Sequence, residues 1–289
     1  MFDVSVIVVN WNTREYLREC LSHLYQNPPP NVSFDVWVVD NASSDDSVDM
    51  VKREFPQVRL ICNAENAGFS RANNQAIRAS NSRYVFLLNS DATTHPGALD
   101  ALIEYADMCP RSGVMGPKVL NPDGSLQSSC RSFPTLWAGF FRNTKLGRFF
   151  PNNKYLKQYM LSDLDHSKVS IVGWLSGCAM LIRRELIDKI GDLDERFFMY
   201  CEDVDICKRC WDAGYEVTYM PRAVVTHAIG KSSDMNYEKM TGQLFDSWYL
   251  YYVKHFAQRG RLRRIAVHYG LWLYKIYRVA KRRRQKQHF

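Results

Sequence analysis

The first 108 residues alternate between short apolar runs rich in β-branched side chains and longer segments whose apolar residues recur at helical spacing. A continuous apolar run of this kind is typical of a strand buried on both faces of a parallel sheet. Strands that alternate with helices form right-handed βαβ units. We therefore predict an α/β fold with a mostly parallel central sheet and helices on both faces. The expected strands are residues 4–9, 34–39, 58–61 and 84–88, and the expected helices begin near Thr13, at Ser43 or Ser44, at Phe69 and after Pro96.

The alternation breaks after Gly116. Residues 131–168 mix aromatic, basic and Asn side chains with weak periodicity, which predicts a long, mobile excursion. Apolar patterns return beyond it, and two helical patterns fill the C-terminal part of the chain. The expected elements are strands at 169–174, 179–182 and 215–220, the last stopping before Pro221, and a helix at 201–213.

Charge is divided unevenly along the chain. There are 38 basic and 30 acidic residues, which give a net charge of +8. Residues 259–289 contain 8 Arg, 3 Lys and no acid, so residues 1–258 carry 27 basic and 30 acidic residues, a net of −3. An acidic body argues against an evenly basic nucleic-acid-binding surface. The basic end requires an anionic partner or exposure to solvent.

Hydropathy and cysteine usage favour a cytoplasmic protein. No stretch of about 20 uncharged apolar residues is present, so we expect no membrane-spanning helix. The N-terminal apolar run has Asp3 and no basic residue before it, which is typical of a buried strand rather than a signal peptide. The eight cysteines are scattered through apolar segments, and the pair Cys207 and Cys210 has no second pair with which to form a zinc site. We expect reduced thiols in the core.

Polar residues directly follow three of the expected strands. Asn10, Asp40 and Asp91 stand at carboxyl ends, where open α/β sheets bind ligands. Asp91 is a candidate ligand for a divalent cation over a diphosphate, because hard cations prefer oxygen ligands. Asp40 could accept hydrogen bonds from a nucleobase or a ribose hydroxyl. The ordinary alternative for each carboxylate is a helix cap or a turn.

The turn before the expected helix at Phe69 contains Asn66 and Gly68. Helix N-termini attract phosphates, and glycine allows close approach of the backbone, so this turn is a candidate phosphate contact. Neither GxGxxG nor GxxxxGK[ST] occurs in the chain, so dinucleotide and P-loop interpretations lose their main support.

The most specific segment is residues 197–205, where three acids follow a dense apolar and aromatic run. Glu202 and Asp205 share a helix face, while Asp203 points elsewhere. Acids favour the first turn of a helix through its dipole. An apolar setting also raises a carboxylate's pKa and makes it a better general base. His227 follows an expected strand and is either a structural histidine or a metal ligand at the same edge of the sheet.

These segments together resemble an inverting glycosyltransferase of family 2, with the GT-A fold, and most of all the bacterial rhamnosyltransferases of surface-polysaccharide assembly. The matching motifs span roughly residues 4–230 and occur in the family's order. They are SVIVVNWN at residues 5–12, VDNAS at 39–43, NAGFSRANN at 66–74, LNSD at 88–91, GWLSG at 173–177, FMYCEDVD at 198–205, and His227.

The resemblance implies roles by position. Asp40 would contact the donor nucleoside, Asp91 would bind Mg²⁺ or Mn²⁺ as the last acid of the DxD motif, and Asp203 would be the catalytic base. The chain departs from the family at Asn89, which replaces the first acid of that motif. The expected site residues are Asp203 and Glu202 for catalysis; Asn10, Asn12, Asp40, Asn41, Asn66, Gly68, Arg71, Asn74 and Asn89 for the donor nucleotide; Asp91 and His227 for the metal; and Trp174, Ser176, Gly177 and Tyr200 for the sugar and acceptor.

The implied activity is transfer of a hexose, L-rhamnose from dTDP-L-rhamnose, to a lipid-linked glycan by metal-assisted single displacement. A UDP-sugar donor on the same fold is the first alternative. A nucleotide-sugar-binding module without catalysis is the second, and the retained Glu202 and Asp203 argue against it. A basic nucleic-acid-binding protein is the third, and the acidic body argues against that, so we expect no nucleic-acid partner. The expected domains are a GT-A domain over residues 1–230, with a donor half to about residue 118 and an acceptor half from about 119, and a helical extension over 231–289.

The extension ends in an amphipathic pattern flanked by Arg and Lys. Such a helix suits a membrane interface, so we expect residues 259–289 to bind anionic lipids of the inner leaflet and to hold a cytoplasmic enzyme beside its lipid-linked acceptor. The alternative is a solvated helix that packs its apolar stripe on the body. The stripe consists of Leu262, Ile265, Tyr269, Trp272, Leu273, Ile276 and Val279.

Overall fold

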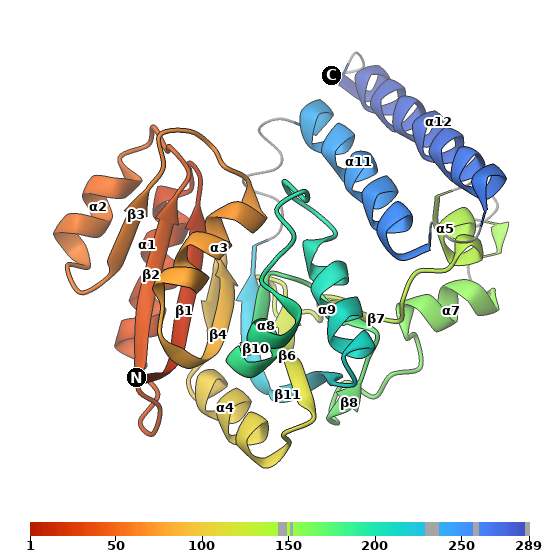
Figure 1. The fold of residues 1–289 in the computed structure, drawn as a ribbon. Coiled ribbons are helices and arrows are strands. Elements are labelled where there is room, and N and C mark those ends of the chain that lie inside the picture. The colour runs from red at the N-terminus through yellow and green to blue at the C-terminus, as the bar shows by residue number, and fades with distance from the viewer. Residues whose placement is uncertain (144–148, 151–152, 229–236, 257–259, 287–289) are drawn as a thin grey trace.

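A nine-stranded mixed sheet forms the centre of the molecule (Figure 1). The computed structural model describes residues 1–143, 149–150, 153–228, 237–256 and 260–286. The strand order is β3-β2-β1-β4-β10-β6-β11-β5, and β8 pairs with β11 outside this path.

The N-terminal half of the sheet is parallel, as the apolar runs predict. Its strands are β1 (Phe2–Asn10), β2 (Phe34–Asp40), β3 (Arg59–Cys62) and β4 (Ser82–Asn89). In the register of β1 against β2, Asn10 pairs with Asp40, and in the register of β1 against β4, Val9 pairs with Asn89. The carboxyl ends of these strands therefore lie level, and their polar residues share one edge of the sheet.

The second half mixes strand directions. Strand β10 (Ala179–Arg183) runs antiparallel between β4 and β6 (Ser112–Leu120), and β6 runs parallel to β11 (Glu216–His227). Strands β5 (Ala92–Thr94) and β8 (Ser170–Ile171) run antiparallel to β11. The pairing of β5 with β11 sets His227 opposite Ala92, one residue after Asp91.

Helices cover both faces of the sheet, as expected. The side chains of α1 (Arg14–Gln26), α2 (Ser47–Glu54) and α4 (Ala98–Met108) enter one apolar core. The side chains of α3 (Phe69–Ala79), α8 (Arg184–Ile190) and α9 (Glu202–Asp212) enter the other. Each core is built on alternate residues of the strands, because successive strand side chains point to opposite faces.

The structure differs from the expected elements in several places. Residues 144–148 and 151–152 of the expected excursion lie outside the described residues. The long excursion over residues 131–168 contains two helices, α5 (Leu136–Asn143) and α7 (Lys154–Met160). The strand expected at 169–174 is divided between β8 in the main sheet and β9 (Trp174–Leu175), which pairs with β7 (Cys130–Arg131) in a separate two-stranded sheet. Gly173 lies between them, and a Cβ there would come within 2.6 Å of the Phe133 nitrogen, so the chain bends closely past residues 132–133.

The strand expected to stop before Pro221 does not end there. Strand β11 continues to His227, and its register against β6 shifts between Met220 and Val224. A bulge leaves residues unpaired in the ladder, so a proline, which has no N–H, can stand there without breaking a hydrogen bond between strands. In addition, α2 begins at Ser47 rather than at Ser43 or Ser44.

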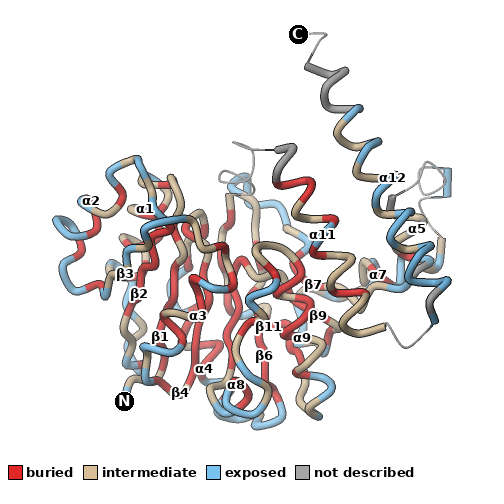
Figure 2. The backbone as a smooth tube through the Cα atoms, turned by 45° about the horizontal axis from the view of Figure 1, so that its top comes forward, coloured by how far each residue is buried: buried red, intermediate tan, exposed pale blue. Residues whose placement is uncertain are grey.

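Two long helices, α11 (Tyr237–Phe256) and α12 (Arg261–Lys286), complete the chain (Figure 1). Tyr251 of α11 is 1% exposed and belongs to the second core. Helix α12 packs on α11 through Tyr274 against Phe245 and His268 against Tyr249. Figure 2 shows how exposed α12 is compared with α11. In the described part of the chain, every helix is too short or too polar to cross a membrane.

Candidate active site

Asp40 forms the centre of the turn that follows β2. Its Oδ1 accepts a hydrogen bond from Asn10 Nδ2 at 2.8 Å, and its Oδ2 accepts one from the Ser43 backbone N–H at 2.8 Å. Asn10 Nδ2 also reaches Ser43 Oγ at 3.0 Å. Asp40 and Asn10 are 2% and 0% exposed. The carboxylate expected to contact the nucleoside is thus held in one orientation at the sheet edge.

Asn12 and Asn41 connect this turn to its neighbours. Asn12 has a left-handed backbone, φ 53°, and its Oδ1 accepts a hydrogen bond from the Ser44 N–H at 2.7 Å. Asn41 Nδ2 donates to the Gly68 carbonyl at 3.3 Å, and its Oδ1 accepts from Asn63 Nδ2 at 2.9 Å. Asn12 thus joins the end of β1 to the turn after β2, and Asn41 joins the end of β2 to the turn before α3.

Gly68 admits a neighbouring chain segment. Its φ is +83°, and a Cβ would lie 2.6 Å from the Phe198 carbonyl oxygen. That same oxygen accepts the Phe69 N–H at 2.6 Å, and Asn66 Oδ1 accepts the Gly68 N–H at 3.0 Å. The sequence predicted that Gly68 allows a phosphate to approach the backbone. In this structure the group that approaches Gly68 is Phe198. Arg71, on the first turns of α3, is exposed.

Asn74 is buried and joins α3 to the segment before the acidic motif. Its Nδ2 donates to the Leu193 carbonyl at 2.8 Å and to Glu195 Oε1 at 3.1 Å. Its Oδ1 accepts the Leu193 N–H at 3.0 Å. All of these contacts lie within the protein, so the structure gives Asn74 a bridging position between α3 and residues 193–195.

The two expected metal ligands lie together at the ends of β4 and β11. Asp91 Oδ1 is 3.2 Å from His227 Nε2, and Asn89 Nδ2 is 3.3 Å from the same nitrogen. The side chains of His227 and Asp91 are only 10% and 9% exposed. Among the residues that the structure describes, no group of three His, Cys, Asp or Glu side chains forms a metal cluster.

The surroundings of His227 indicate its tautomer. Gln127 Nε2 donates to Asn121 Oδ1 and to the His227 carbonyl, which turns Gln127 Oε1 toward His227 Nδ1 at 2.8 Å. A proton on Nδ1 leaves Nε2 with a lone pair. Two acceptors, Nε2 and Asp91 Oδ1, then face each other, and a cation between them would be stabilising. One carboxylate and one imidazole suit Mn²⁺ or Mg²⁺ and leave positions for phosphate oxygens and water. The residues present therefore fit the metal.

The acid pair stands at the N-terminus of α9. Asp203 Oδ2 accepts the Gly177 N–H at 3.1 Å, and Oδ1 accepts the Val204 N–H at 2.8 Å. Burial raises the pKa of Asp203, against the opposing effects of these two amides and the Arg131 charge. Burial, followed by the charge of Asp203, raises the pKa of Glu202 well above its usual range.

The two carboxyls have different surroundings. Glu202 is 7% exposed, and its Oε2 has no hydrogen-bond partner among the described residues. Asp203 accepts two backbone N–H donors, from Gly177 and Val204, which stabilise a negative charge. Burial opposes the negative charge of both carboxyls, and at Asp203 the Gly177 and Val204 amides act against that effect.

Residues 176–178 join the acid pair to the metal ligands. The Cys178 carbonyl accepts the Asn89 N–H at 2.9 Å, at the end of β4. Burial raises the pKa of the Cys178 thiol, and the charges of Asp91 and Asp203 raise it further. Gly177 contacts Asp203 and the adjacent Cys178 contacts Asn89, so the expected base lies near the strand end that leads to Asp91.

The residues expected to line the sugar and acceptor pocket lie beside this site. Trp174 is 6% exposed, its Nε1 donates to the Ser132 carbonyl, and the Arg131 guanidinium lies 5.1 Å from its ring. The Ser176 N–H donates to the Ser129 carbonyl at 2.7 Å. A Cβ on Gly177 would lie 3.3 Å from the Asp203 Cβ, so glycine lets this backbone approach the acid. Tyr200 has a positive φ of 70°.

Two residues at the site have no signal in the sequence. Gln127 orients His227, and Arg131 carries a positive charge near Asp203. They lie 100 and 72 residues from these partners and follow no motif. The pairing of β7 with β9 brings Arg131 to the site, and the contact with the His227 carbonyl at the end of β11 brings Gln127 there.

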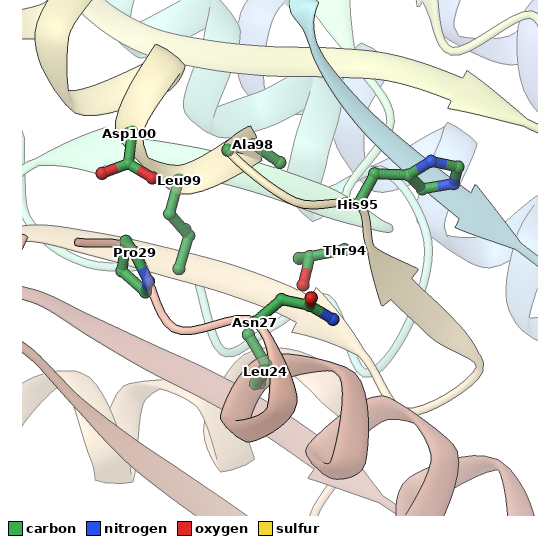
Figure 3. A pocket seen from close by; sticks show the side chains of 9 residues that line it. Leu24, Asn27, Pro29, Thr94, His95, Ala98, Leu99 and Asp100 are labelled. Atoms are coloured by element: carbon green, nitrogen blue, oxygen red, sulfur yellow. The ribbon is translucent and has the colours of Figure 1, made fainter.

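A surface pocket lies elsewhere, between the end of α1 and the start of α4 (Figure 3). Leu24, Asn27, Thr94, His95 and Leu99 are among its lining residues. None of the residues predicted for the site lines it, so the carboxyl edge of the sheet is the candidate active site.

The fold and the site define an enzyme of the GT-A glycosyltransferase class: a sheet covered on both faces, with an Asp–His pair at one edge and the acid pair Glu202 and Asp203 at the start of α9. Within that class, the chain belongs to glycosyl transferase family 2, whose family model matches residues 5–191. The acid pair lies beyond the matched residues.

Two curated relatives have rhamnosyltransferase names. The chain is 35% identical over 239 residues to N-acetylglucosaminyl-diphospho-decaprenol L-rhamnosyltransferase of Mycobacterium tuberculosis, covering 78% of this chain and 76% of the relative. It is 26% identical to rhamnosyltransferase WbbL of Escherichia coli, covering 78% of this chain and 83% of the relative.

Solved structures show the same fold at lower identity. The mannosyltransferase PcManGT of Pyrobaculum calidifontis, solved with GDP-Man and Mn²⁺, has a TM-score of 0.59 at 21% identity. The match covers 90% of this chain but 65% of that one. GalNAc-T7, solved with UDP, GalNAc and Mn²⁺, also has a TM-score of 0.59, at 14% identity, and the match covers 79% of this chain and 44% of that one.

Proposed function

We propose that the protein transfers L-rhamnose from dTDP-L-rhamnose to a lipid-linked glycan and inverts the anomeric centre in a single displacement. The observation that carries the proposal is the setting of Asp203, a half-buried carboxyl at the start of α9 that accepts two backbone amides beside the buried Glu202. The choice of sugar and acceptor draws support from the name of the mycobacterial relative.

Asp203 would be the general base. Its carboxylate takes the proton from the acceptor hydroxyl as that oxygen attacks the sugar, and its raised pKa favours the transfer. The Gly177 and Val204 amides fix the direction of the two carboxylate oxygens. Burial and the charge of Asp203 raise the pKa of Glu202, which disfavours a second negative charge in the pocket.

Asp91 and His227 would hold Mg²⁺ or Mn²⁺ on the donor side, with Gln127 keeping His227 in the tautomer that leaves Nε2 available. When bound, the metal stabilises the charge that develops on the departing diphosphate. Asp40, fixed by Asn10 and Ser43, would receive the nucleoside at the neighbouring strand end.

Donor binding and transfer test the proposal together. We expect calorimetry to show binding of dTDP-L-rhamnose that needs Mn²⁺ and is lost in Asp91→Ala. Asp203→Asn should bind the donor as the wild type does but transfer sugar at least about 100-fold more slowly, the lower end of the range for loss of a general base. Normal transfer by Asp203→Asn would refute the base assignment. Preference for a UDP-sugar would refute the rhamnose donor and leave the mechanism intact.

We also propose that α12 attaches the enzyme to an anionic membrane surface. The alternative of a stripe packed on the body has no support in the geometry, because Leu262, Trp272 and Leu273 are 83%, 50% and 60% exposed. Helix α12 instead turns His268, Tyr274 and the half-buried Lys275 toward α11. An apolar stripe that faces away from the protein, on a helix with a basic flank and no acid, fits the interface of a lipid bilayer.

Vesicle sedimentation with the whole protein tests the attachment. We expect binding to vesicles that contain phosphatidylglycerol, and weak binding to vesicles of phosphatidylcholine alone. Trp272→Asp combined with Leu273→Asp should abolish binding to both, whereas the matched control Trp211→Asp, an exposed aromatic of α9, should not change it. Equal binding by the double variant and the wild type would refute the attachment.

A further inference from the structure

Asp205, the third acid of the motif, has no part in the proposed chemistry and is 0% exposed. Three cationic or hydrogen-bonding groups surround its carboxylate. Arg209 Nε lies 2.8 Å from Oδ2, Lys254 Nζ lies 2.7 Å from Oδ1, and His255 Nε2 lies 2.7 Å from Oδ1. Burial opposes ionisation of Asp205, but the His255 hydrogen bond and the charges of Arg209 and Lys254 outweigh it and lower its pKa.

The partners of Asp205 come from two elements. Arg209 is one helical turn further along α9, and it also donates to the Ile190, Gly191 and Asp192 carbonyls. Lys254 and His255 come from the last turn of α11, about fifty residues later in the chain. An ion cluster buried at this depth depends on every partner, since removing one leaves a charge uncompensated.

Helix α11 holds the same segment at a second point. Ser247 Oγ donates to the Met199 carbonyl at 2.8 Å, and Lys254 Nζ also reaches Asp194 Oδ2 at 2.7 Å. The segment from Asp194 to Asp205 is therefore attached to α11 near its start, middle and end. On the other side, the Phe198 carbonyl is bound by α3.

Between these attachments the chain takes a strained turn. Tyr200 and Cys201 both have left-handed backbones, with φ of 70° and 67°, directly before Glu202 and Asp203. Consecutive non-glycine residues in this region persist only where the surrounding structure fixes them. The direction in which the acid pair leaves this turn is thus set by contacts outside it.

We propose that Lys254 and His255 are positioning residues for the catalytic acid: through Asp205 they fix the start of α9 and hence the direction of Asp203. The inference rests on the proposed role of Asp203 as base. It adds that the catalytic geometry depends on α11, which lies outside the residues matched by the family model.

Substitution of His255 tests the positioning, because one variant removes the donor and another retains it. Donor binding by calorimetry gives the number of folded sites, and kcat is expressed per donor-binding site. We expect His255→Phe to lower kcat by at least about tenfold, a modest part of what a misplaced catalytic group can cost, while the donor KM stays within about twofold. His255→Gln keeps an N–H donor at that point and should recover most of kcat.

A control on α9 separates positioning from general stability. Lys208 pairs with the exposed Asp212 on the same helix and is not among the partners of the Asp205 carboxylate, which are Arg209, Lys254 and His255. Lys208→Ala should leave kcat per site unchanged. An unchanged kcat in His255→Phe, or equal loss in the Phe and Gln variants, would overturn the inference.

Hydrogen exchange gives a readout that does not depend on activity. We expect the amides of residues 201–206 to exchange at least about tenfold faster in His255→Phe than in the wild type, and at the wild-type rate in Lys208→Ala. Unchanged exchange in His255→Phe would overturn the inference. If the wild type transfers no sugar from any donor, the proposed function fails, and the exchange rates alone then decide whether α11 holds this segment.

Discussion

At the scale of single residues, the site depends on carboxyl groups in unlike surroundings. Asp40 and Asp203 accept backbone N–H groups, Asp205 is surrounded by cations, and Glu202 has one oxygen without a partner among the described residues. The environment of each carboxyl, rather than its residue type, decides whether it is ionised.

Glu202 should lower the stability of the protein as pH rises. Its pKa in the folded protein lies well above its ordinary value of 4.5 because of burial and the Asp203 charge. Between those two pKa values the unfolded chain has lost a proton that the folded protein retains, so the free energy of unfolding falls as pH rises. Glu202→Gln removes this dependence. We expect its melting temperature to match that of the wild type near pH 4 and to exceed it increasingly toward pH 7.

Glu65→Gln is the control for this series, because Glu65 is exposed. It should follow the wild-type melting curve at every pH. A constant offset between Glu202→Gln and the wild type from pH 4 to pH 7 would contradict the raised pKa.

Most candidate site residues could be named from the sequence because they end apolar strands or belong to short motifs, as with Asp91 and Asp203. Their partners could not. Gln127 and Lys254 reach the site from 100 and 49 residues away from the side chains they contact, and no local pattern marks them. Asn74 shows the converse, since its motif position suggested a ligand contact while its side chain bonds to residues 193–195.

At the scale of elements, the helix-and-strand alternation of the first 108 residues was predictable because strand and helix periods differ and each β-branched run is fully buried. The antiparallel direction of β10 was not predictable, because a fully buried strand has the same apolar pattern whether it runs parallel or antiparallel to its neighbours. The bulge in β11 was also hidden, because Pro221 ordinarily ends a central strand.

Strand β10 is followed by an arginine that joins three elements. Arg184, at the start of α8, donates to the Ile77 carbonyl at 2.9 Å, to Ser80 Oγ at 2.8 Å and to the Ser82 carbonyl at 3.3 Å. A lysine ammonium cannot reach this spread of acceptors. We expect Arg184→Lys to lower the free energy of unfolding by about 1–3 kcal/mol, because buried acceptors lose their donors.

Urea unfolding of Arg184→Lys measures this loss. The control is Arg222→Lys, on an exposed arginine that pairs with Glu104 at the surface. Because surface ion pairs contribute little, that variant should unfold at the wild-type midpoint. An equal shift in both variants would mean that the carbonyl contacts of Arg184 add no stability.

At the scale of the whole molecule, charge and apolar surface are segregated. The body carries a net charge of −3, and residues 259–289 carry 11 basic residues and no acid. The two C-terminal helices, α11 and α12, were expected from the sequence. The orientation of α12, with its apolar stripe outward, was not predictable, because a helical period gives the stripe but not what it faces.

This segregation predicts how salt acts on the proposed membrane attachment. Raising NaCl from about 0.1 M to about 0.5 M shortens the Debye length and should release the wild type from phosphatidylglycerol vesicles in a graded manner. Trp272→Asp should weaken binding already at low salt, because it removes apolar contact rather than charge. Salt-independent binding of the wild type to these vesicles would contradict the electrostatic part of the attachment.

The outward stripe of α12 also changes how such an enzyme would find its acceptor. A catalyst seated on a bilayer by one helix meets a lipid-anchored molecule by lateral diffusion in two dimensions. Its turnover then follows the number of acceptors per unit area of membrane rather than their amount per volume of solution. Diluting a suspension of such membranes would leave the rate per enzyme unchanged, whereas diluting the acceptor with inert lipid within each membrane would lower it.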